Sequence, residues 1–358
     1  MATQLTNYQC PACTGPLHYD GASGKLVCDY CGSAYDTAEV EALYAEKSAA
    51  AESAAQNREA PPPDSVWSEN EAAGLRSYSC PSCGAELICD ETTAATSCPY
   101  CGNPTVIGGQ FSGSQKPELV LPFVLDKAAA KSALKTFYKG KKFLPNAFKS
   151  QNHIEEIKGV YVPFWLFDAD AEGEGHYEGL RSEEHREGDY VVTTTEHFDV
   201  FRAGSTQFRK VPVDASTKMP DGHMDAIEPF DYQSLQPFSA AFLPGYLADR
   251  YDVDADTSST RARQRMENTV REELLATVNG YTNVNDLGEN LNVQLTGARY
   301  ALLPVWMLHT KWHGKDFLFA MNGQTGKLVG DLPVDKTKVL AWFAGISLPL
   351  MLLLAFLL

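Results

Sequence analysis

The chain has 358 residues and is acidic, with 46 Asp and Glu side chains against 30 Lys and Arg side chains, a net charge of −16. Its 44% apolar and 21% charged residues exclude a fully disordered chain and a polytopic membrane protein, and its length suggests two or three units. The acidic balance argues against a general nucleic-acid binder, because contacts with phosphates require Lys and Arg.

The clearest motif is a repeated arrangement of eight of the nine cysteines. Each of two segments holds two Cys-X-X-Cys knuckles separated by 14 residues, and the second segment follows the first with a period of 70. Paired knuckles at this spacing are typical of zinc ribbons, with a short hairpin between them. We therefore predict two structural Zn²⁺ sites, at Cys10, Cys13, Cys28 and Cys31 and at Cys80, Cys83, Cys98 and Cys101.

Each predicted ribbon is too short to form a core of its own, so the metal must supply folding energy. Four thiolates leave no open coordination position, which excludes a catalytic metal. Gly32, Gly84 and Gly102 follow knuckles where a positive φ is often required. Disulfides are the disfavoured alternative, and iron could replace zinc. Cys89 is interpreted as a packed side chain rather than a reactive thiol.

Composition divides the rest of the chain into a spacer, a large domain and a terminal helix. The fold class is α+β, with two small Cys₄ ribbons attached to the larger domain. The predicted parts are ribbon 1 over 1–37, a helical spacer and linker over 38–76, ribbon 2 over 77–110, an α+β domain over 118–335 and a helix over 339–358.

Within the α+β domain, helices alternate with segments of β character. We predict helices over 126–139 and 259–278, strands over 119–125, 160–169, 190–201 and 291–308, and an acidic, Gly-rich hairpin turn or loop over 172–189. Val162–Leu166 (VPFWL) is echoed by Leu303–Met307 (LPVWM), which suggests an internal duplication into two halves. The aromatic side chains are interpreted as core, and a ligand groove between the halves is the alternative.

The helix over 126–139 carries a stripe of lysines, Lys127, Lys131, Lys135 and Lys139. The segment 126–158 has eight lysines against three acids. A solvated helix face is the simpler interpretation, and contact with an anionic membrane surface is the functional one.

The last twenty residues, 339–358, contain no charge and are long enough for a membrane-spanning helix of about 30 Å. Lys327, Lys336 and Lys338 precede them, so the positive-inside rule predicts a single-pass, tail-anchored protein of the cell membrane with its bulk in the cytoplasm. A buried core helix, or the first span of a longer protein, are the alternatives. The N-terminus lacks the features of a signal peptide.

No HExxH, GxSxG or phosphate-loop motif occurs, so we do not expect an enzyme. His309 and His313 are four apart, but the surrounding sequence favours a strand, where this spacing does not form a helical metal pair. The remaining histidines are scattered.

The CPxC ribbons, YVPFW (161–165) and FAMNGQTGKLVGDLP (319–333) resemble the bacterial TFIIB-type zinc-ribbon membrane proteins, some of which are labelled primosomal PriA-like helicases. The helicase label does not fit, since the chain has no nucleotide-binding loop. The resemblance implies action beside a phage-shock-protein-A-like coat protein and an SPFH (flotillin-like) protein at stressed membranes.

Residues 1–110 hold four basic and fourteen acidic side chains, a net charge of −10. This charge favours the docking of proteins over nucleic acid. We expect a membrane-anchored adaptor that recruits partner proteins, possible partners being those that the resemblance implies. A nucleic-acid-associated factor at the membrane is the alternative, followed by a small-ligand receptor or an enzyme.

Overall fold

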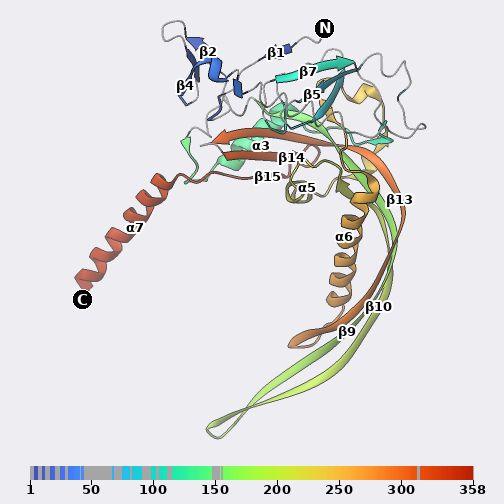
Figure 1. Ribbon diagram of the computed structural model, residues 1–358. Helices are drawn as coiled ribbons and strands as arrows, with labels where there is room; N and C mark the ends of the chain where they lie inside the picture. Colours follow the sequence, from blue (N-terminus) through green and yellow to red (C-terminus); the bar gives the residue numbers. More distant parts are fainter. Residues whose placement is uncertain are drawn as a thin grey trace. The chain divides into compact units, whose positions relative to one another are not determined.

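The computed structural model has a mixed α+β fold (Figure 1). The chain divides into two compact units: unit 1 is Met1–Pro163, Ser216–Arg250 and Leu302–Leu358, and unit 2 is Phe164–Ala215 and Tyr251–Ala301. The range 118–335, predicted as one domain, therefore contributes to both units. The structure describes residues 4–6, 10–12, 17–20, 25–28, 31–40, 42–43, 67, 75–80, 83–90, 98–101, 105–110, 115–146, 154, 156–312 and 315–357. Most of the spacer predicted over 38–76 lies outside these residues.

A small antiparallel sheet surrounds the first cysteine group of unit 1. It consists of β2 (Leu17–Asp20), β3 (Lys25–Cys28) and β4 (Ala34–Tyr35). Leu17 pairs with Cys28, which confirms the hairpin predicted between the first two knuckles.

The second cysteine group belongs to the larger sheet of unit 1. Strand β6 lies between its two knuckles and pairs antiparallel with β5, before Cys80, and with β12, far along the chain. Strand β12 also runs parallel to the start of β9, with Leu247 opposite Val160. In order across the sheet, the strands of this part are β1 (Gln4–Thr6), β7 (Thr105–Gln110), β5 (Leu75–Ser79), β6 (Glu86–Asp90) and β12 (Leu247–Asp249). Ribbon 2 is thus joined to the main sheet by backbone hydrogen bonds.

The core of unit 1 lies where helix α3 (Lys127–Tyr138) packs against strands β13 (Asn283–Trp312) and β14 (Lys315–Asn322). Asp126 caps α3 by accepting a hydrogen bond of 2.8 Å from the Ala129 backbone N–H, as expected for a helix start. The helix predicted over 126–139 is confirmed. Its buried residues Ala130, Leu134 and Tyr138 meet the strand residues Trp306, Leu308, Phe319 and Met321.

The smaller elements of unit 1 complete this arrangement. They are β8 (Leu119–Val120), α5 (Asp221–Ala226), η3 (Tyr232–Ser234), β11 (Gln236–Pro237), η4 (Ala240–Phe242) and β15 (Leu328–Gly330). Strand β8 pairs with β11, and β15 pairs with β14.

Unit 2 is built on a long hairpin of β9 (Lys158–Glu187) and β10 (Tyr190–Asp214). Strand β13 lies beside β9, and helix α6 (Ala255–Ala276) runs along one face of these strands (Figure 1). The buried helix residues Ala262, Met266, Val270 and Leu274 are spaced for one apolar stripe. The helix predicted over 259–278 is confirmed, with Asp254 as its cap.

The hairpin turn or loop predicted over 172–189 is shorter than expected, because residues 172–187 belong to β9 and only residues 188–189 form the turn before β10. Gly188 lies in the turn, with φ of 63°, whereas glycines within β9 permit close packing. A Cβ atom at Gly173 would lie 2.6 Å from Val270 Cγ1, and one at Gly179 would lie 2.5 Å from Tyr281 Cδ1. These glycines let neighbouring side chains approach the strand closely.

The order of helix, long strand and antiparallel strand occurs twice in the chain, as α3, β9 and β10 and as α6, β13 and β14. The internal duplication suggested by the two VPFWL-like segments stays a prediction.

Helix α7 (Lys336–Leu357) covers the predicted C-terminal helix. Measured over the described residues, none of the helices is both long and apolar enough to cross a bilayer. The structure therefore does not support the membrane span predicted over 339–358. Several large apolar side chains of α7 are exposed, among them Leu340, Trp342, Phe343, Ile346, Leu348, Leu350, Met351 and Leu354.

Candidate metal centres

The second cysteine group forms a compact cluster of four sulfur atoms. The Sγ atoms of Cys80 and Cys101 are 3.6 Å apart, as are those of Cys83 and Cys98, and all four lie within 4.8 Å of one another. Zinc–sulfur bonds of about 2.3 Å in a tetrahedron place the sulfurs about 3.8 Å apart. A disulfide would need about 2.05 Å. The cluster could therefore hold one metal ion, and its cysteines are not disulfide-bonded.

The knuckle turns explain how the sulfurs converge. Gly84 has φ of 71°, and its N–H donates to the Cys80 carbonyl at 2.9 Å. Gly32 repeats this geometry, with φ of 72° and a bond of 2.9 Å to the Cys28 carbonyl. Both conformations lie in the left-handed region that favours glycine, so the role predicted for these two glycines is confirmed. Gly102 lies outside the described residues.

The first cysteine group brings together three sulfurs, those of Cys10, Cys28 and Cys31. The Sγ atoms of Cys10 and Cys31 are 3.6 Å apart, and the Tyr35 hydroxyl lies 3.7 Å from Cys10 Sγ. Burial, followed by the hydrogen bond with Cys10, raises the pKa of Tyr35 to about 12. This cluster could also hold a metal ion. Cys13, its predicted fourth ligand, lies outside the described residues.

Crowding of the sulfurs perturbs their protonation in the second cluster. Hydrogen bonds from Cys101, and then from Cys83 and Cys98, hold the pKa of Cys80 well below its ordinary value. The pKa of Cys83 is raised, chiefly by its hydrogen bond with Cys101. Metal ligation requires thiolates, so binding of an ion would release the remaining protons.

A buried polar group lies beside the second cluster, and sequence reasoning missed it. The side chains of Lys218 and Asp249 are 7% and 0% exposed, with Nζ 3.7 Å from Oδ2, and the Ser216 hydroxyl donates to the same oxygen at 3.2 Å. Tyr100 lies between Cys98 and Cys101. Burial, followed by the charge of Asp249, raises the pKa of Tyr100. The short sequence Leu-Ala-Asp of β12 gave no sign that Asp249 is buried.

Ribbon 2 and β12 are also joined by an ion pair. Arg250 Nη1 lies 2.9 Å from Glu86 Oε2, and the Arg250 backbone N–H donates to the Glu86 carbonyl at 3.3 Å. Lys158, at the start of β9, is near the sulfurs. Desolvation lowers its pKa to about 8, an effect that the charges of Cys98 and Cys101 oppose. The cluster is therefore part of the interior of unit 1 rather than of an independent finger.

Cys89 is fully buried on β6, opposite Arg76, and does not belong to either described metal cluster. Among the described residues, four histidines lie within 4.0 Å of a carboxylate, and none joins a metal cluster; the four are His185, His197, His223 and His309. His309 is on β13 with Nε2 3.3 Å from Asp316 Oδ1, and His197 Nδ1 lies 2.7 Å from Glu178 Oε1. His313 lies outside the described residues.

The two tryptophans of the repeated segments are core residues, as interpreted from the sequence. The Trp165 indole N–H donates to the Val253 carbonyl at 2.9 Å, and that of Trp306 donates to the Leu125 carbonyl at 3.0 Å. Both side chains are buried.

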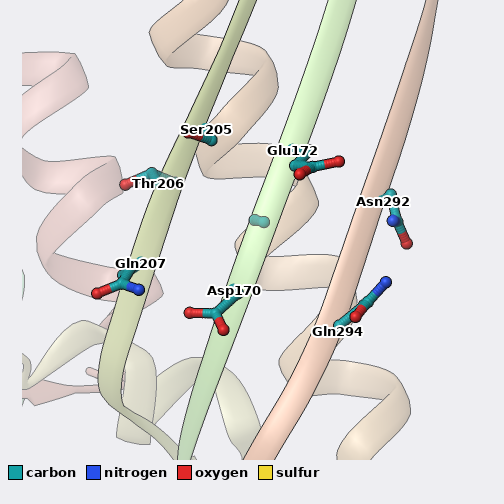
Figure 2. A pocket seen from close by; sticks show the side chains of 8 residues that line it. Asp170, Glu172, Ser205, Thr206, Gln207, Asn292 and Gln294 are labelled. Atoms are coloured by element: carbon teal, nitrogen blue, oxygen red, sulfur yellow. The ribbon is translucent and has the colours of Figure 1, made fainter.

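A separate hollow of about 190 Å³ lies on the strands of unit 2 (Figure 2). Figure 2 shows polar side chains from β10, β9 and β13 around it. Its lining has no aromatic side chain. It is lined by Asp170, Ala171, Glu172, Ser205, Thr206, Gln207, Asn292 and Gln294.

Comparison with known proteins places this geometry in context. A family model described as Trm112p-like protein matches residues 9–36, the first cysteine segment. No solved structure matches the chain. "Uncharacterized protein YdjG" of Bacillus subtilis (strain 168) is 36% identical over 320 residues, which cover 76% of this chain and 94% of the relative. Neither description uses the TFIIB-type or PriA-like labels. At this identity and coverage, the chain belongs to the same family as YdjG.

Proposed function

We propose that this chain is a zinc-stabilised adaptor that attaches to a membrane through α7 and presents its acidic ribbon region to partner proteins. The observation that carries the proposal is the Cys80–Cys101 cluster, whose sulfurs are spaced for one tetrahedral ion and whose strand β6 is hydrogen-bonded into the main sheet. A closed set of four thiolates suits a structural ion, which stabilises a surface rather than catalysing a reaction.

Zinc is the ion that we propose for both clusters. Tetrahedral sites of four thiolates bind zinc or iron, and zinc does not take part in redox chemistry. Reduced cysteines also suit a location of the ribbons in the cytoplasm, where thiols are kept reduced.

Membrane attachment is supported by the exposed apolar residues of α7. Leu340 and Phe343 are each 68% exposed, and Met351 is 66% exposed. A row of large exposed apolar side chains on one helix favours burial against lipid or another protein. Trp342 near the start of the helix is suited to a membrane–water interface.

Protein docking is supported by the net charge of −10 on residues 1–110, which repels nucleic acid and attracts basic segments. SPFH (flotillin-like) and phage-shock-protein-A-like proteins are the partners that we propose from the resemblance. A basic tail on such a protein would match the charge of the ribbons.

The test is to purify the tagged full-length protein from gently solubilised membranes and to identify the proteins that accompany it by mass spectrometry. The Cys80→Ser/Cys83→Ser variant removes two ligands of the second cluster, and Cys89→Ala is the matched control. Specific partners that are present with the wild type and the control, and lost with the double variant, are expected. Retention of the same partners by the double variant would contradict an adaptor that depends on the second ribbon.

A further inference from the structure

An apolar hollow of about 330 Å³ lies in unit 1 where the loop after α3 meets the segment before α7. Its walls come from two short stretches of chain, and only two of the lining residues are charged. The lining residues are Gly140, Lys141, Lys142, Phe143, Leu144, Leu332, Pro333 and Val334. Phe143 is 40% exposed and Val334 is 62% exposed, so apolar surface is open to the outside here.

The start of α7 is hydrogen-bonded to residues that line or adjoin this hollow. Lys338 Nζ donates to the Leu144 carbonyl at 2.6 Å and to Asn146 Oδ1 at 2.8 Å. The Asp335 N–H donates to the Phe143 carbonyl at 2.8 Å, and its carboxylate accepts from the Thr337 N–H at 3.0 Å. The hollow and the apolar helix therefore form one continuous surface.

Basic side chains border this surface. Lys139, Lys141 and Lys142 are all exposed within four residues of chain. Lys142 Nζ lies 4.2 Å from the centre of the Trp342 ring, and Lys141 Nζ lies 5.3 Å from that of Phe137. Lysines that lie over aromatic rings beside an apolar surface are suited to the boundary between water and an apolar phase.

The acids near the hollow are already engaged with other groups. Asp331 Oδ2 is 3.6 Å from His223 Nε2, and the Asp335 carboxylate accepts the hydrogen bonds that begin α7. Lys139, Lys141 and Lys142 outnumber these two carboxylates, whose charge the hydrogen bonds do not remove, so the loop presents a net positive charge to a ligand that enters.

We propose that this hollow binds one anionic phospholipid, with its phosphate between Lys141 and Lys142 and an acyl chain against Phe143, Val334 and the exposed side of α7. The apolar walls distinguish this ligand from a free phosphate ion, which would gain nothing from them. The inference rests on the proposed attachment of α7 to a membrane, and it adds a preference for the charge of the lipid.

The test is a flotation assay of the full-length protein, diluted from mild detergent into vesicles of phosphatidylcholine alone or of the same lipid with phosphatidylglycerol. The variant Lys141→Gln/Lys142→Gln removes the proposed phosphate contacts and leaves α7 intact. The control Lys210→Gln/Lys315→Gln removes the same charge elsewhere. Circular dichroism checks that each variant is folded.

We expect the wild type and the control to bind vesicles with phosphatidylglycerol more tightly, and the affinity of the Lys141/Lys142 variant for these vesicles to fall about thirty-fold. Its binding to phosphatidylcholine alone should be unchanged. The variant Val334→Asp should lose the same preference, since it places a negative charge in the hollow.

Three results would overturn the inference. Equal binding of the wild type to both vesicles removes the lipid preference and leaves the attachment of α7 intact. Competition by inorganic phosphate alone would indicate a site for the free ion. Absence of flotation with either vesicle refutes membrane attachment itself, and the lipid site with it.

Discussion

Gly173 of β9 and Gly204 of β10 face each other in the register of the long hairpin, yet only Gly173 is covered by other parts of unit 2. A Cβ atom at Gly173 would lie 2.6 Å from Val270 Cγ1 on α6 and 3.1 Å from Leu291 Cδ2 on β13, whereas one at Gly204 would meet nothing within 4 Å. Helix α6 thus packs against β9 at a position where the sequence supplies no side chain.

This asymmetry predicts opposite effects of two identical substitutions. Gly173→Ala should reduce the free energy of unfolding by about 1–3 kcal/mol, because the added methyl group must push Val270 or the helix outward. Gly204→Ala should be neutral or stabilising by about 0.5–1 kcal/mol, since alanine loses less backbone entropy than glycine in a strand. Urea unfolding followed by circular dichroism measures both. Equal destabilisation by the two variants would show that α6 does not lie against Gly173.

The cysteine clusters predict the metal content of the purified protein. We expect two zinc ions per chain by mass spectrometry of the metals, one for each cluster. Cys80→Ser/Cys83→Ser should lose one ion, because two ligands are too few to hold the metal in a structural site. Cys89→Ala should lose none, since its sulfur is outside the clusters. Iron in place of zinc, or an unchanged content in the double variant, would contradict the assignment.

The sequence predicted the local features of the fold better than the long-range ones. The knuckle spacing and the cap at Asp126 are local signals, and the turns and the helix that they predict are present. The connection over 172–189 was predicted too long, because glycines and acids in alternation resemble a loop until a helix is known to cover one face.

The surroundings of the second cluster could not be predicted, since they depend on pairing across long stretches of chain. Glu86 and Arg250 are 164 residues apart in sequence and 2.9 Å apart in space. Asp249 is a buried acid in a short strand, and the residues next to it in sequence do not predict Lys218 and Ser216 as its partners. The C-terminal sequence predicted a helix correctly, whereas its assignment as a membrane span is not supported.

The pairing of β6 with β12 predicts how loss of metal spreads through unit 1. A structural zinc site contributes on the order of 10 kcal/mol in zinc-finger peptides, so a strong zinc chelator should loosen the knuckles and then β6. Amide hydrogen exchange should rise first in β5, β6 and β12, while α6 in unit 2 keeps its protection. An equal rise in α6 would indicate that the two units unfold together, and no rise in β12 would mean that the ribbon is energetically independent of the sheet.

The cap of α6 predicts a pH dependence of unit 2. The Asp254 carboxylate accepts a hydrogen bond of 2.7 Å from the Thr257 N–H, and this bond lowers the pKa of Asp254. A lowered pKa in the folded state means that the stabilisation is present above the ordinary aspartate pKa of about 3.9 and is lost as the pH falls through the folded-state value.

Asp254→Ala should therefore reduce the free energy of unfolding by about 1 kcal/mol at neutral pH and by less in acid. Asp254→Asn keeps a capping oxygen that does not titrate, so it should retain most of the stability and lose its pH dependence. Urea unfolding at neutral and acidic pH compares the three proteins, and a cost of Asp254→Ala that is the same at both pH values would show that the charged cap does not stabilise α6.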